Sequence, residues 1–294
     1  MGTAKLRIAV VTGANKGIGL EICRQLLEKG VMVVLTARDA TRGKAAVSKL
    51  QDGGSKDVVF HQLDVADPVS IASLKEFIQH HFKRLDILVN NAGVSGIELD
   101  VEALNRLNKE YDLQDITPLM IQQYEKAKEC TDINYYGTKR MCEAFIPLLQ
   151  LSQSPRIINL TSLYGQLQVI PSEAIKGELR DADNLTEERL DNIVCSFLND
   201  FKTNNVKEDT WPTHVSAYKV SKVAVSSYTR ILARKYTELS INCVHPGYVR
   251  SDINYNIGVL SVEEGAKGPV MLALLPDGSS SGQFYDQTEL SSFE

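Results

Sequence analysis

Three polar side chains are of types that could together move a proton to or from a carbonyl oxygen: Ser162, Tyr218 and Lys222. Tyr218 and Lys222 are four residues apart in a segment with a helical pattern, so they share one face of that helix. An ammonium near a phenol stabilises the phenolate, which lowers the tyrosine pKa from about 10 toward the working range. The Ser162 hydroxyl could hold the carbonyl oxygen. Taken alone, Tyr-x-x-x-Lys is more often an exposed helix face than a catalytic pair.

A phosphate-binding turn is predicted near the amino terminus, where Gly13, Gly17 and Gly19 follow the apolar run 8–11. The pattern indicates a strand, a tight turn and a helix. Glycines permit positive φ angles and let a pyrophosphate approach the backbone, and the helix start offers free N–H groups to the anion. The spacing G-x-x-x-G-x-G differs from the general G-x-G-x-x-G motif, so an ordinary strand-to-helix turn explains these glycines equally well.

The segments that must position these residues alternate between strand and helix patterns. We expect strands at 8–11, 31–36, 58–63, 85–89, 156–160, 241–244 and 283–286, and helices at 18–28, 68–82, 122–149, 216–236 and in a segment that ends near Leu50. Strands that alternate with helices form a parallel sheet covered on both faces, and ligands bind where its strands end. The predicted fold is therefore α/β: a Rossmann-type doubly wound parallel sheet with helices on both faces, in a single domain over residues 1–294.

Two segments are too long to be plain connections between these elements: residues 95–121 and 166–213. Both leave strand ends on the side where such sheets bind ligands, so each is a candidate lid or substrate wall. For 95–121 we favour a lid. For 166–213, which contains a helical pattern near 186–201, a solvated surface insertion is an equally good interpretation.

The composition is that of an ordinary globular protein, with 294 residues of which 43% are hydrophobic and 23% charged. A net charge of −5 gives no support for a nucleic-acid partner. The five cysteines are scattered and never spaced C-x-x-C, so neither a disulfide framework nor a metal site is indicated. No apolar run approaches the length of a membrane span. We therefore expect a cytoplasmic protein with no metal, no membrane and no nucleic-acid partner.

Five motifs, in their order along the chain, resemble the short-chain dehydrogenase/reductase family: the glycine turn, Asn90-Asn91-Ala92-Gly93, Ser162, Tyr218-x-x-x-Lys222 and Pro246-Gly247. The resemblance covers nearly the whole chain and implies oxidoreduction of a carbonyl or alcohol with NAD(P)(H). It implies that Tyr218 is the acid or base and that Lys222 holds the nicotinamide ribose. Ser162 would orient the substrate, and Asn134 would keep a water in the proton relay.

The same resemblance implies which residues contact the cofactor, although Ser251 departs from the threonine that the family commonly has there. The implied cofactor-binding residues are Gly13, Asn15, Lys16, Gly17, Ile18, Gly19, Arg38, Asp64, Val65, Asn90, Gly93, Tyr218, Lys222, Pro246, Gly247, Val249 and Ser251.

The choice between NAD and NADP depends on the end of the second predicted strand. A site for NAD places an acid there to bind the ribose 2′-hydroxyl, whereas a 2′-phosphate requires cations. Here Ala37 occupies the position of that acid, Arg38 follows it, and Lys16 in the glycine turn adds a second cation. Arginine suits bidentate contact with a phosphate, so NADPH/NADP+ is expected. Asp39 would oppose this choice if its side chain turned inward, and Arg38 alone could be a solvated surface charge.

Within the family, the chain is similar to the monomeric carbonyl-reductase-like branch that includes plant menthone/neomenthol and salutaridine reductases. This similarity is carried by residues 60–65, 185–189 and 282–286 and by Trp211-Pro212. It implies a monomer and a ketone substrate of terpenoid or alkaloid type. Some relatives in this branch have glutamate in place of the catalytic tyrosine and reduce a C=C bond, so Tyr218 favours carbonyl chemistry. Apolar and aromatic candidates for substrate contact are Val94, Leu163, Tyr164, Tyr248 and Ile253.

The expected function is NADPH-dependent reduction of the ketone of an apolar small molecule, reversible to alcohol oxidation. Two alternatives remain open. One is an NAD(P)+-dependent alcohol dehydrogenase that uses the same residues. The other is a non-catalytic protein that senses a dinucleotide, because a fold alone does not specify an activity.

Overall fold

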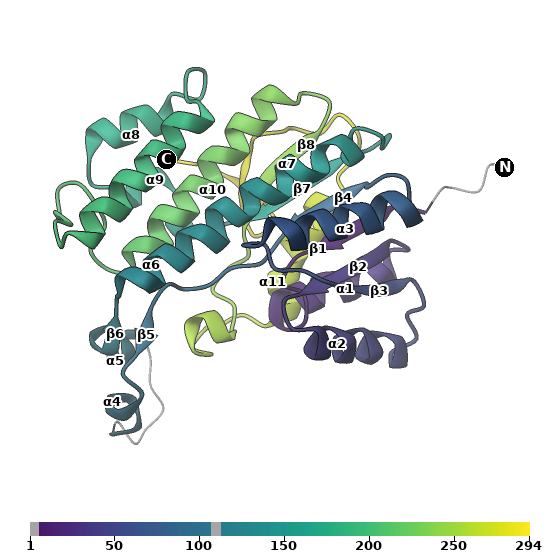
Figure 1. The fold of residues 1–294 in the computed structure, drawn as a ribbon, viewed down its shortest axis with the longest axis horizontal. Helices are drawn as coiled ribbons and strands as arrows, with labels where there is room; N and C mark the ends of the chain where they lie inside the picture. The colour runs from purple at the N-terminus through teal and green to yellow at the C-terminus, as the bar shows by residue number, and fades with distance from the viewer. Residues whose placement is uncertain (1–5, 107–112) are drawn as a thin grey trace.

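A single sheet of eight strands organises the protein, whose computed structural model describes residues 6–106 and 113–294 (Figure 1). The strand order is β10-β9-β8-β7-β4-β1-β2-β3, and neighbouring strands run parallel except for β10 against β9. Because the winding reverses between β1 and β4, this is a doubly wound sheet and the predicted fold is confirmed. The strands are β1 (Ile8–Val11), β2 (Met32–Ala37), β3 (Val58–Gln62), β4 (Ile87–Asn90), β7 (Arg156–Leu160), β8 (Ser240–His245), β9 (Phe284–Asp286) and β10 (Glu289–Ser291).

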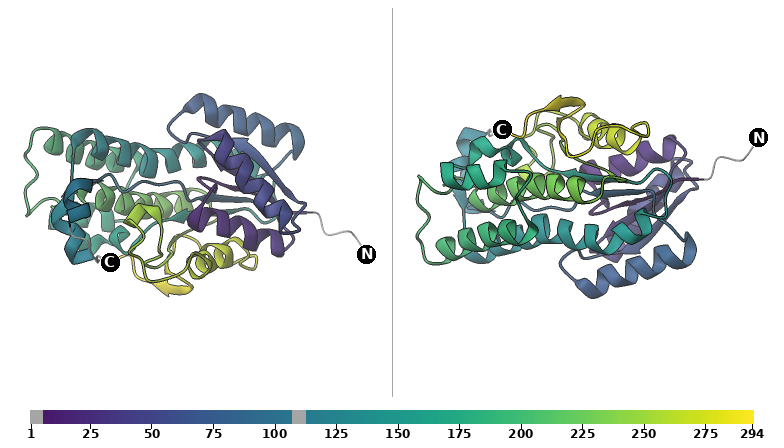
Figure 2. Two further views of the ribbon diagram at one scale, coloured as in Figure 1. Left: turned by 90° about the horizontal axis from the view of Figure 1, so that it is seen from below. Right: turned by 90° about the horizontal axis from the view of Figure 1, so that it is seen from above.

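Helices cover both faces of the sheet, which lies between two helical layers in Figure 2. Each face has its own apolar core, because successive side chains of a strand point to opposite faces: Val10 belongs to one core and Val11 to the other. One face carries α3 (Pro68–His81), α6 (Tyr124–Thr131), α7 (Thr138–Leu149) and α10 (Ser216–Lys235). The other carries α1 (Gly17–Glu28), α2 (Ala40–Asp52) and α11 (Val262–Ala273).

The helix predicted over 122–149 is not regular throughout. A π-helical segment, η2 (Asp132–Gly137), joins α6 to α7. A π-helical turn accommodates one extra residue and is found mostly at functional sites. In this chain it carries Asn134.

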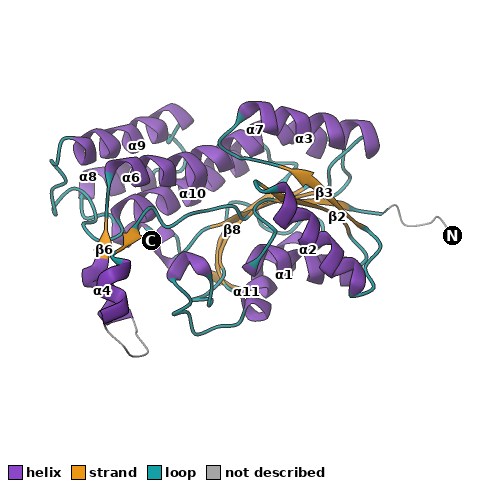
Figure 3. Ribbon diagram, turned by 60° about the horizontal axis from the view of Figure 1, so that its bottom comes forward, coloured by secondary structure: helices purple, strands orange, loops and turns teal. Residues whose placement is uncertain are grey.

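The first insertion, residues 95–121, forms a small unit of its own that projects from the body of the molecule (Figure 3). Two short strands, β5 (Glu98–Leu99) and β6 (Met120–Ile121), pair antiparallel at its base. Between them lie α4 (Val101–Arg106), α5 (Leu113–Ile116) and the 3₁₀ turn η1 (Thr117–Leu119). The sequence predicted the insertion but none of these elements.

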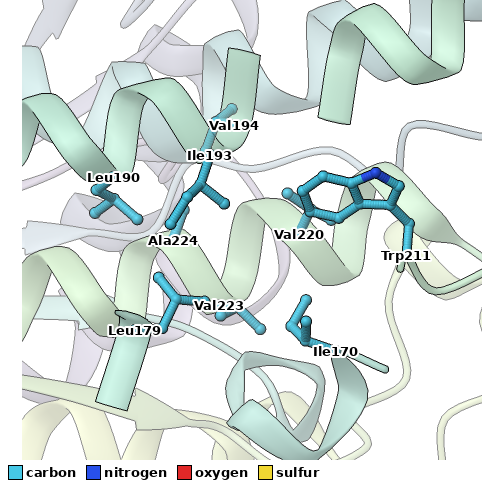
Figure 4. A pocket seen from close by; sticks show the side chains of 9 residues that line it. All are labelled: Ile170, Leu179, Leu190, Ile193, Val194, Trp211, Val220, Val223 and Ala224. Atoms are coloured by element: carbon cyan, nitrogen blue, oxygen red, sulfur yellow. The ribbon is translucent and has the colours of Figure 1, made fainter. Parts of the chain in front are cut away.

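The second insertion, residues 166–213, contributes α8 (Glu173–Arg180) and α9 (Glu187–Lys202), of which only α9 was predicted. Apolar side chains from both helices meet α10, with Trp211 beside them (Figure 4). They enclose a cavity of about 10 Å³, no larger than a single water site. This insertion is therefore part of the packed body and not a solvated decoration. No helix among residues 6–106 and 113–294 combines the length and apolarity needed to cross a membrane.

Candidate active site

A cavity of about 1000 Å³ lies at the edge of the sheet where the parallel strands end. Its walls come from the glycine turn, the segments that follow β2, β4 and β7, the first turn of α10 and the loop after β8. The first insertion closes one side through Ile97, Ile116, Thr117 and Met120. The cavity is large enough for a dinucleotide together with a small substrate.

The glycine turn leads directly into α1 and forms one end of this cavity. Gly13 and Gly17 have φ angles of +63° and +56°, and a Cβ on Gly19 would lie 2.4 Å from the Asn91 amide nitrogen. Lys16 occupies the N-cap position but provides no side-chain hydrogen bond to the helix. The first N–H groups of α1 therefore lack a side-chain cap, which is the arrangement that binds phosphate groups.

The segment after β4 is fixed to the glycine turn by Thr12 and Asn91. The Thr12 hydroxyl accepts hydrogen bonds from the backbone N–H groups of Asn91 and Ala92, both at 2.9 Å. The Asn91 amide donates to the carbonyl oxygens of Thr12 and Gly13 at 2.8 and 3.1 Å. The sequence interpretation missed Asn91, which lines the cavity.

Asn90 was expected to contact the cofactor, but it is not among the residues that line the cavity. Its side chain is buried and donates a 2.8 Å hydrogen bond to Asn159 of the neighbouring strand β7. Asn90 is still part of β4, where consecutive side chains point to opposite sides of the strand. Asn91, the next residue, lines the cavity instead.

Ser162, Tyr218 and Lys222 meet in the cavity, as the sequence predicted they should. Ser162 follows β7 and Tyr218 lies on the first turn of α10, so two separate elements bring these hydroxyl groups into the same cavity. The Lys222 ammonium lies one turn further along α10, 5.5 Å from the centre of the Tyr218 ring. It donates a 2.9 Å hydrogen bond to the carbonyl oxygen of Leu160, the last residue of β7.

The close approach of these two elements depends on Gly165, three residues after Ser162. A Cβ at this position would lie 2.1 Å from the Thr161 hydroxyl, 2.7 Å from the Ser226 hydroxyl and 3.0 Å from the Lys222 carbonyl oxygen. No side chain fits in that space. Glycine is therefore required for the turn η3 (Leu163–Gly165) to lie against α10, the helix that carries Tyr218.

The electrostatics of this group differ from the expectation that Lys222 would lower the pKa of Tyr218. Burial raises the pKa of Tyr218 well above its usual value, and the nearby Ser162 hydroxyl lowers it in part. Burial also lowers the pKa of Lys222 to about 8. The phenol is therefore protonated throughout the neutral range, which suits the donation of a proton to a substrate oxygen.

Asn134 lies behind the cavity wall and is not among the residues that line it. Its side-chain oxygen accepts a 2.8 Å hydrogen bond from the Val94 N–H, and its amide nitrogen donates to the Val94 carbonyl at 3.0 Å and to the Ser221 hydroxyl at 3.0 Å. The observed contacts thus fix the position of Val94 and connect it to α10. They do not place the side chain at a substrate.

The π-helical segment that carries Asn134 is bonded to the second insertion. The hydroxyl of Tyr135, whose side chain is buried, donates a 2.7 Å hydrogen bond to Asp191 of α9. Asp191 also accepts from Lys139 at 2.7 Å, and Lys139 lies 3.5 Å from Glu187. These contacts are buried or partly buried, so they hold α9 against the segment more firmly than surface ion pairs would.

Cations gather at the end of the cavity near β2. Arg38 and Arg42 both line it, and Arg42 was missed from the sequence. Asp39, the residue that would oppose a phosphate, also lines the cavity, but its carboxylate caps α2: it accepts a 2.9 Å hydrogen bond from the Arg42 N–H and lies 3.7 Å from the Arg42 guanidinium. Lys16 forms an exposed ion pair with Asp252 of the loop after β8. This end of the cavity therefore has the chemistry of a phosphate site.

The remaining predicted site residues fall into two groups. Residues proposed for the cofactor that line the cavity are Gly13, Asn15, Lys16, Gly17, Ile18, Gly19, Arg38, Asp64, Val65, Gly93, Tyr218, Lys222, Pro246, Gly247, Val249 and Ser251. Of the substrate candidates, Val94, Tyr164, Tyr248 and Ile253 line it and Leu163 does not. Leu163 lies on the outer side of η3 with 44% of its surface exposed.

Comparison with known proteins identifies the family of the chain. Residues 7–174 match the short chain dehydrogenase family. The chain is 54% identical to a (+)-neomenthol dehydrogenase of Arabidopsis thaliana, over 98% of each chain, and 39% identical to a carbonyl reductase [NADPH] 3 of Mus musculus, over 92% of this chain and 91% of the relative. It also resembles the solved structure of salutaridine reductase from Papaver somniferum, with 47% identity, a TM-score of 0.90 and coverage of 95% and 99% of the two chains.

Proposed function

The chain belongs to the short-chain dehydrogenase family, and we propose that it is an NADPH-dependent reductase of ketones in apolar small molecules of terpenoid or alkaloid type. One observation carries this proposal. Ser162, Tyr218 and Lys222 come from two separate elements and meet in one cavity beside a glycine turn suited to a dinucleotide. A protein that only bound a dinucleotide would not need all three, which disfavours a non-catalytic sensor.

Each residue has a role that follows from its chemistry. NADPH, when bound, supplies a hydride to the carbonyl carbon. Tyr218, whose phenol stays protonated at neutral pH, donates its proton to the carbonyl oxygen, and the Ser162 hydroxyl donates a hydrogen bond to the same oxygen. Lys222 would hold the ribose next to the nicotinamide. Asn134 fixes the cavity wall at Val94.

The preference for NADPH over NADH is supported by the cations at the end of β2. Arg38 and Arg42 line the cavity there, and Asp39 is engaged as a helix cap. Lys16 approaches from the glycine turn. One relative carries NADPH in its name, carbonyl reductase [NADPH] 3. A dinucleotide with a 2′-phosphate suits the glycine turn, the start of α1 that lacks a side-chain cap, and the cations near the end of β2.

The substrate class is proposed from the cavity and the relatives. Val94, Ile116, Met120 and Ile253 give the substrate part apolar walls, and the first insertion would act as its lid. The relatives named neomenthol dehydrogenase and salutaridine reductase suggest cyclic ketones or the corresponding alcohols. The same residues would catalyse alcohol oxidation, so an alcohol dehydrogenase is the second candidate.

We further propose that the protein is a cytoplasmic monomer. The second insertion covers part of α6 and α10 through α9, and the family resemblance implies that this face serves assembly in shorter relatives. Because α9 covers the corresponding face in this chain, we expect that the chain does not oligomerise through it.

The Tyr218→Phe variant tests the proposed chemistry, because it removes the hydroxyl and keeps the ring. We expect ketone reduction to fall by about 10²- to 10⁴-fold while NADPH binding is kept. Turnover is followed by the loss of NADPH absorbance with a panel of monoterpenoid, alkaloid and quinone carbonyls, and cofactor binding by calorimetry. The matched control is Tyr124→Phe on α6, whose residue does not line the cavity. Unchanged turnover in Tyr218→Phe would refute the assigned role.

A further inference from the structure

Lys219 places a cation in the part of the cavity that would receive the substrate. It is the residue after Tyr218 and lines the cavity together with Tyr164, Tyr248 and His214. Its ammonium lies 5.0 Å from the centre of the Tyr164 ring, and Tyr164 packs edge-to-face against Tyr218 with ring centres 6.4 Å apart. Only one aromatic ring therefore separates this charge from the catalytic phenol.

No carboxylate of the described residues forms an ion pair with Lys219, whereas two other cations that line the cavity are paired. Lys16 is bonded to Asp252, and Arg42 to Asp39. The side chain of Lys219 is half-buried, and burial lowers its pKa. The Tyr164 ring provides a weak cation–π contact and no counter-charge. The ammonium thus faces the cavity with its charge uncompensated.

The carboxylates that line the cavity have other partners: Asp39 lies against Arg42, Asp252 against Lys16, and Asp64 accepts a hydrogen bond from the Ala66 N–H. Arg250, on the loop after β8, is itself a cation, and its guanidinium donates to the Gly258 carbonyl oxygen at 3.3 Å. His214 is exposed and carries no negative charge in any state. Lys219 and Arg250 are therefore two cations of the cavity wall that have no ion pair with any carboxylate of the described residues.

We propose that Lys219 makes this enzyme select its ketones by charge: it favours those that carry an anionic oxygen group and disfavours those that carry a protonated amine. The inference rests on the proposed ketone reduction and narrows its substrate class to neutral and anionic ketones; alkaloid ketones, which carry a protonated amine at neutral pH, would be disfavoured. In a partly desolvated cavity, Lys219 repels a second positive charge placed close to it. This repulsion weakens the binding of a cationic substrate, as the loss of a favourable contact would. A carboxylate in the same place would pair with the ammonium over Tyr164.

Three cyclohexanones that share a ring and differ only in the group at carbon 4 can test this selection. The probes are neutral 4-methylcyclohexanone, anionic 4-oxocyclohexanecarboxylate and a permanently cationic 4-trimethylammonium cyclohexanone. For the wild-type protein with NADPH at pH 7, we expect kcat/KM for the anion to exceed that for the cation by about tenfold or more.

Substitutions at Lys219 should change this ratio in a defined order. Lys219→Met should bring the anion-to-cation ratio close to one, Lys219→Glu should reverse it, and Lys219→Arg should preserve it. The matched control is Lys202→Met, because Lys202 also lies over a tyrosine ring, that of Tyr124 at 5.7 Å, but does not line the cavity. This control should keep the wild-type ratio.

The outcomes separate the charge selection from the proposed function. If the wild-type protein reduces the neutral ketone and Lys219→Met leaves the anion-to-cation ratio unchanged, the charge selection is wrong and ketone reduction stands. If no ketone is reduced, the proposed function fails. The charge selection is then tested by calorimetry, which measures the binding of 4-oxocyclohexanecarboxylate to the NADP+ complex. Weaker binding to Lys219→Met than to the wild-type protein would support the selection, and equal binding would overturn it.

Discussion

The side-chain oxygen of Gln122 accepts hydrogen bonds from both the backbone N–H of Ser216, at 2.7 Å, and its hydroxyl, at 3.0 Å. Gln122 directly follows the first insertion, and Ser216 begins α10 two residues before Tyr218. The residue before Ser216 is Val215, whose backbone is left-handed with a φ of +46° and whose side chain cannot cap the helix. An amide from a distant segment therefore caps the catalytic helix.

Replacing Gln122 by alanine should loosen the start of α10. We expect the free energy of unfolding to fall by about 1–2 kcal/mol, because the Ser216 N–H loses its partner, and kcat to fall because Tyr218 lies on the same turn. Urea unfolding and steady-state kinetics measure the two effects. Gln123→Ala is the control, since that side chain makes an exposed 3.2 Å contact with Glu98. Equal stability of the Gln122→Ala and wild-type proteins would show that the cap contributes nothing.

The pKa of Lys222 predicts how stability changes at alkaline pH. Burial lowers this pKa to about 8 in the folded protein, against 10.5 for a free lysine. Between pH 8 and 10.5 this lysine is protonated in the unfolded chain but mostly neutral in the folded one, so the free energy of unfolding rises with pH. Below pH 8 the lysine is protonated in both forms, and the folded protein bears the full cost of burying its charge. Relative to Lys222→Met, the wild-type protein should gain about 2 kcal/mol between pH 8 and 9.5. Urea unfolding of both proteins at the two pH values measures this gain. The same change in the free energy of unfolding for the wild-type protein and Lys222→Met would contradict it.

Removing the cations near β2 should change the preference between the two nicotinamide cofactors. In the double variant Lys16→Ala/Arg38→Ala, we expect the KM for NADPH to rise by about tenfold or more while the KM for NADH changes little, since only NADPH carries the 2′-phosphate. Initial rates with each cofactor give both constants. Lys44→Met on α2 serves as the control, because Lys44 does not line the cavity. A KM that rises equally for both cofactors would mean that these cations do not bind the 2′-phosphate of NADPH.

Two glycine-to-alanine substitutions should have opposite effects. At Gly165 the added methyl would meet Thr161, Ser226 and the backbone of Lys222, so Gly165→Ala should cost about 2 kcal/mol of stability or more and reduce activity. At Gly177, inside α8, a methyl would meet nothing within 4 Å, so Gly177→Ala should stabilise by about 0.5–1 kcal/mol. Thermal unfolding and turnover compare the pair. Similar effects at the two positions would contradict the close approach of η3 to α10.

The sheet and its main helices were predictable because their signal is periodic and local. Apolar runs such as 8–11 and 31–36 are buried on both faces in the structure, and Pro68 begins α3 as a proline at a helix start should. The π-helical segment 132–137 could not be predicted, because one extra residue hardly disturbs the periodicity of a long helix.

Side-chain direction limited what the sequence revealed about the site. Asn90 was assigned to the cavity from its position in a motif and Leu163 as an apolar residue near the expected site, yet neither lines the cavity. Alternation along β4 would have favoured Asn91. The contacts of Gln122 with Ser216 and of Lys219 with Tyr164 could not be predicted, because these partners are far apart in the chain.

The hydrogen bond between Tyr135 and Asp191 limits how this protein could be made smaller by engineering. Deleting the second insertion would remove α9 and leave the Tyr135 hydroxyl and the Lys139 ammonium without their acceptors. A shortened version would therefore need phenylalanine at 135 and a neutral residue at 139 before its loss of function could be interpreted.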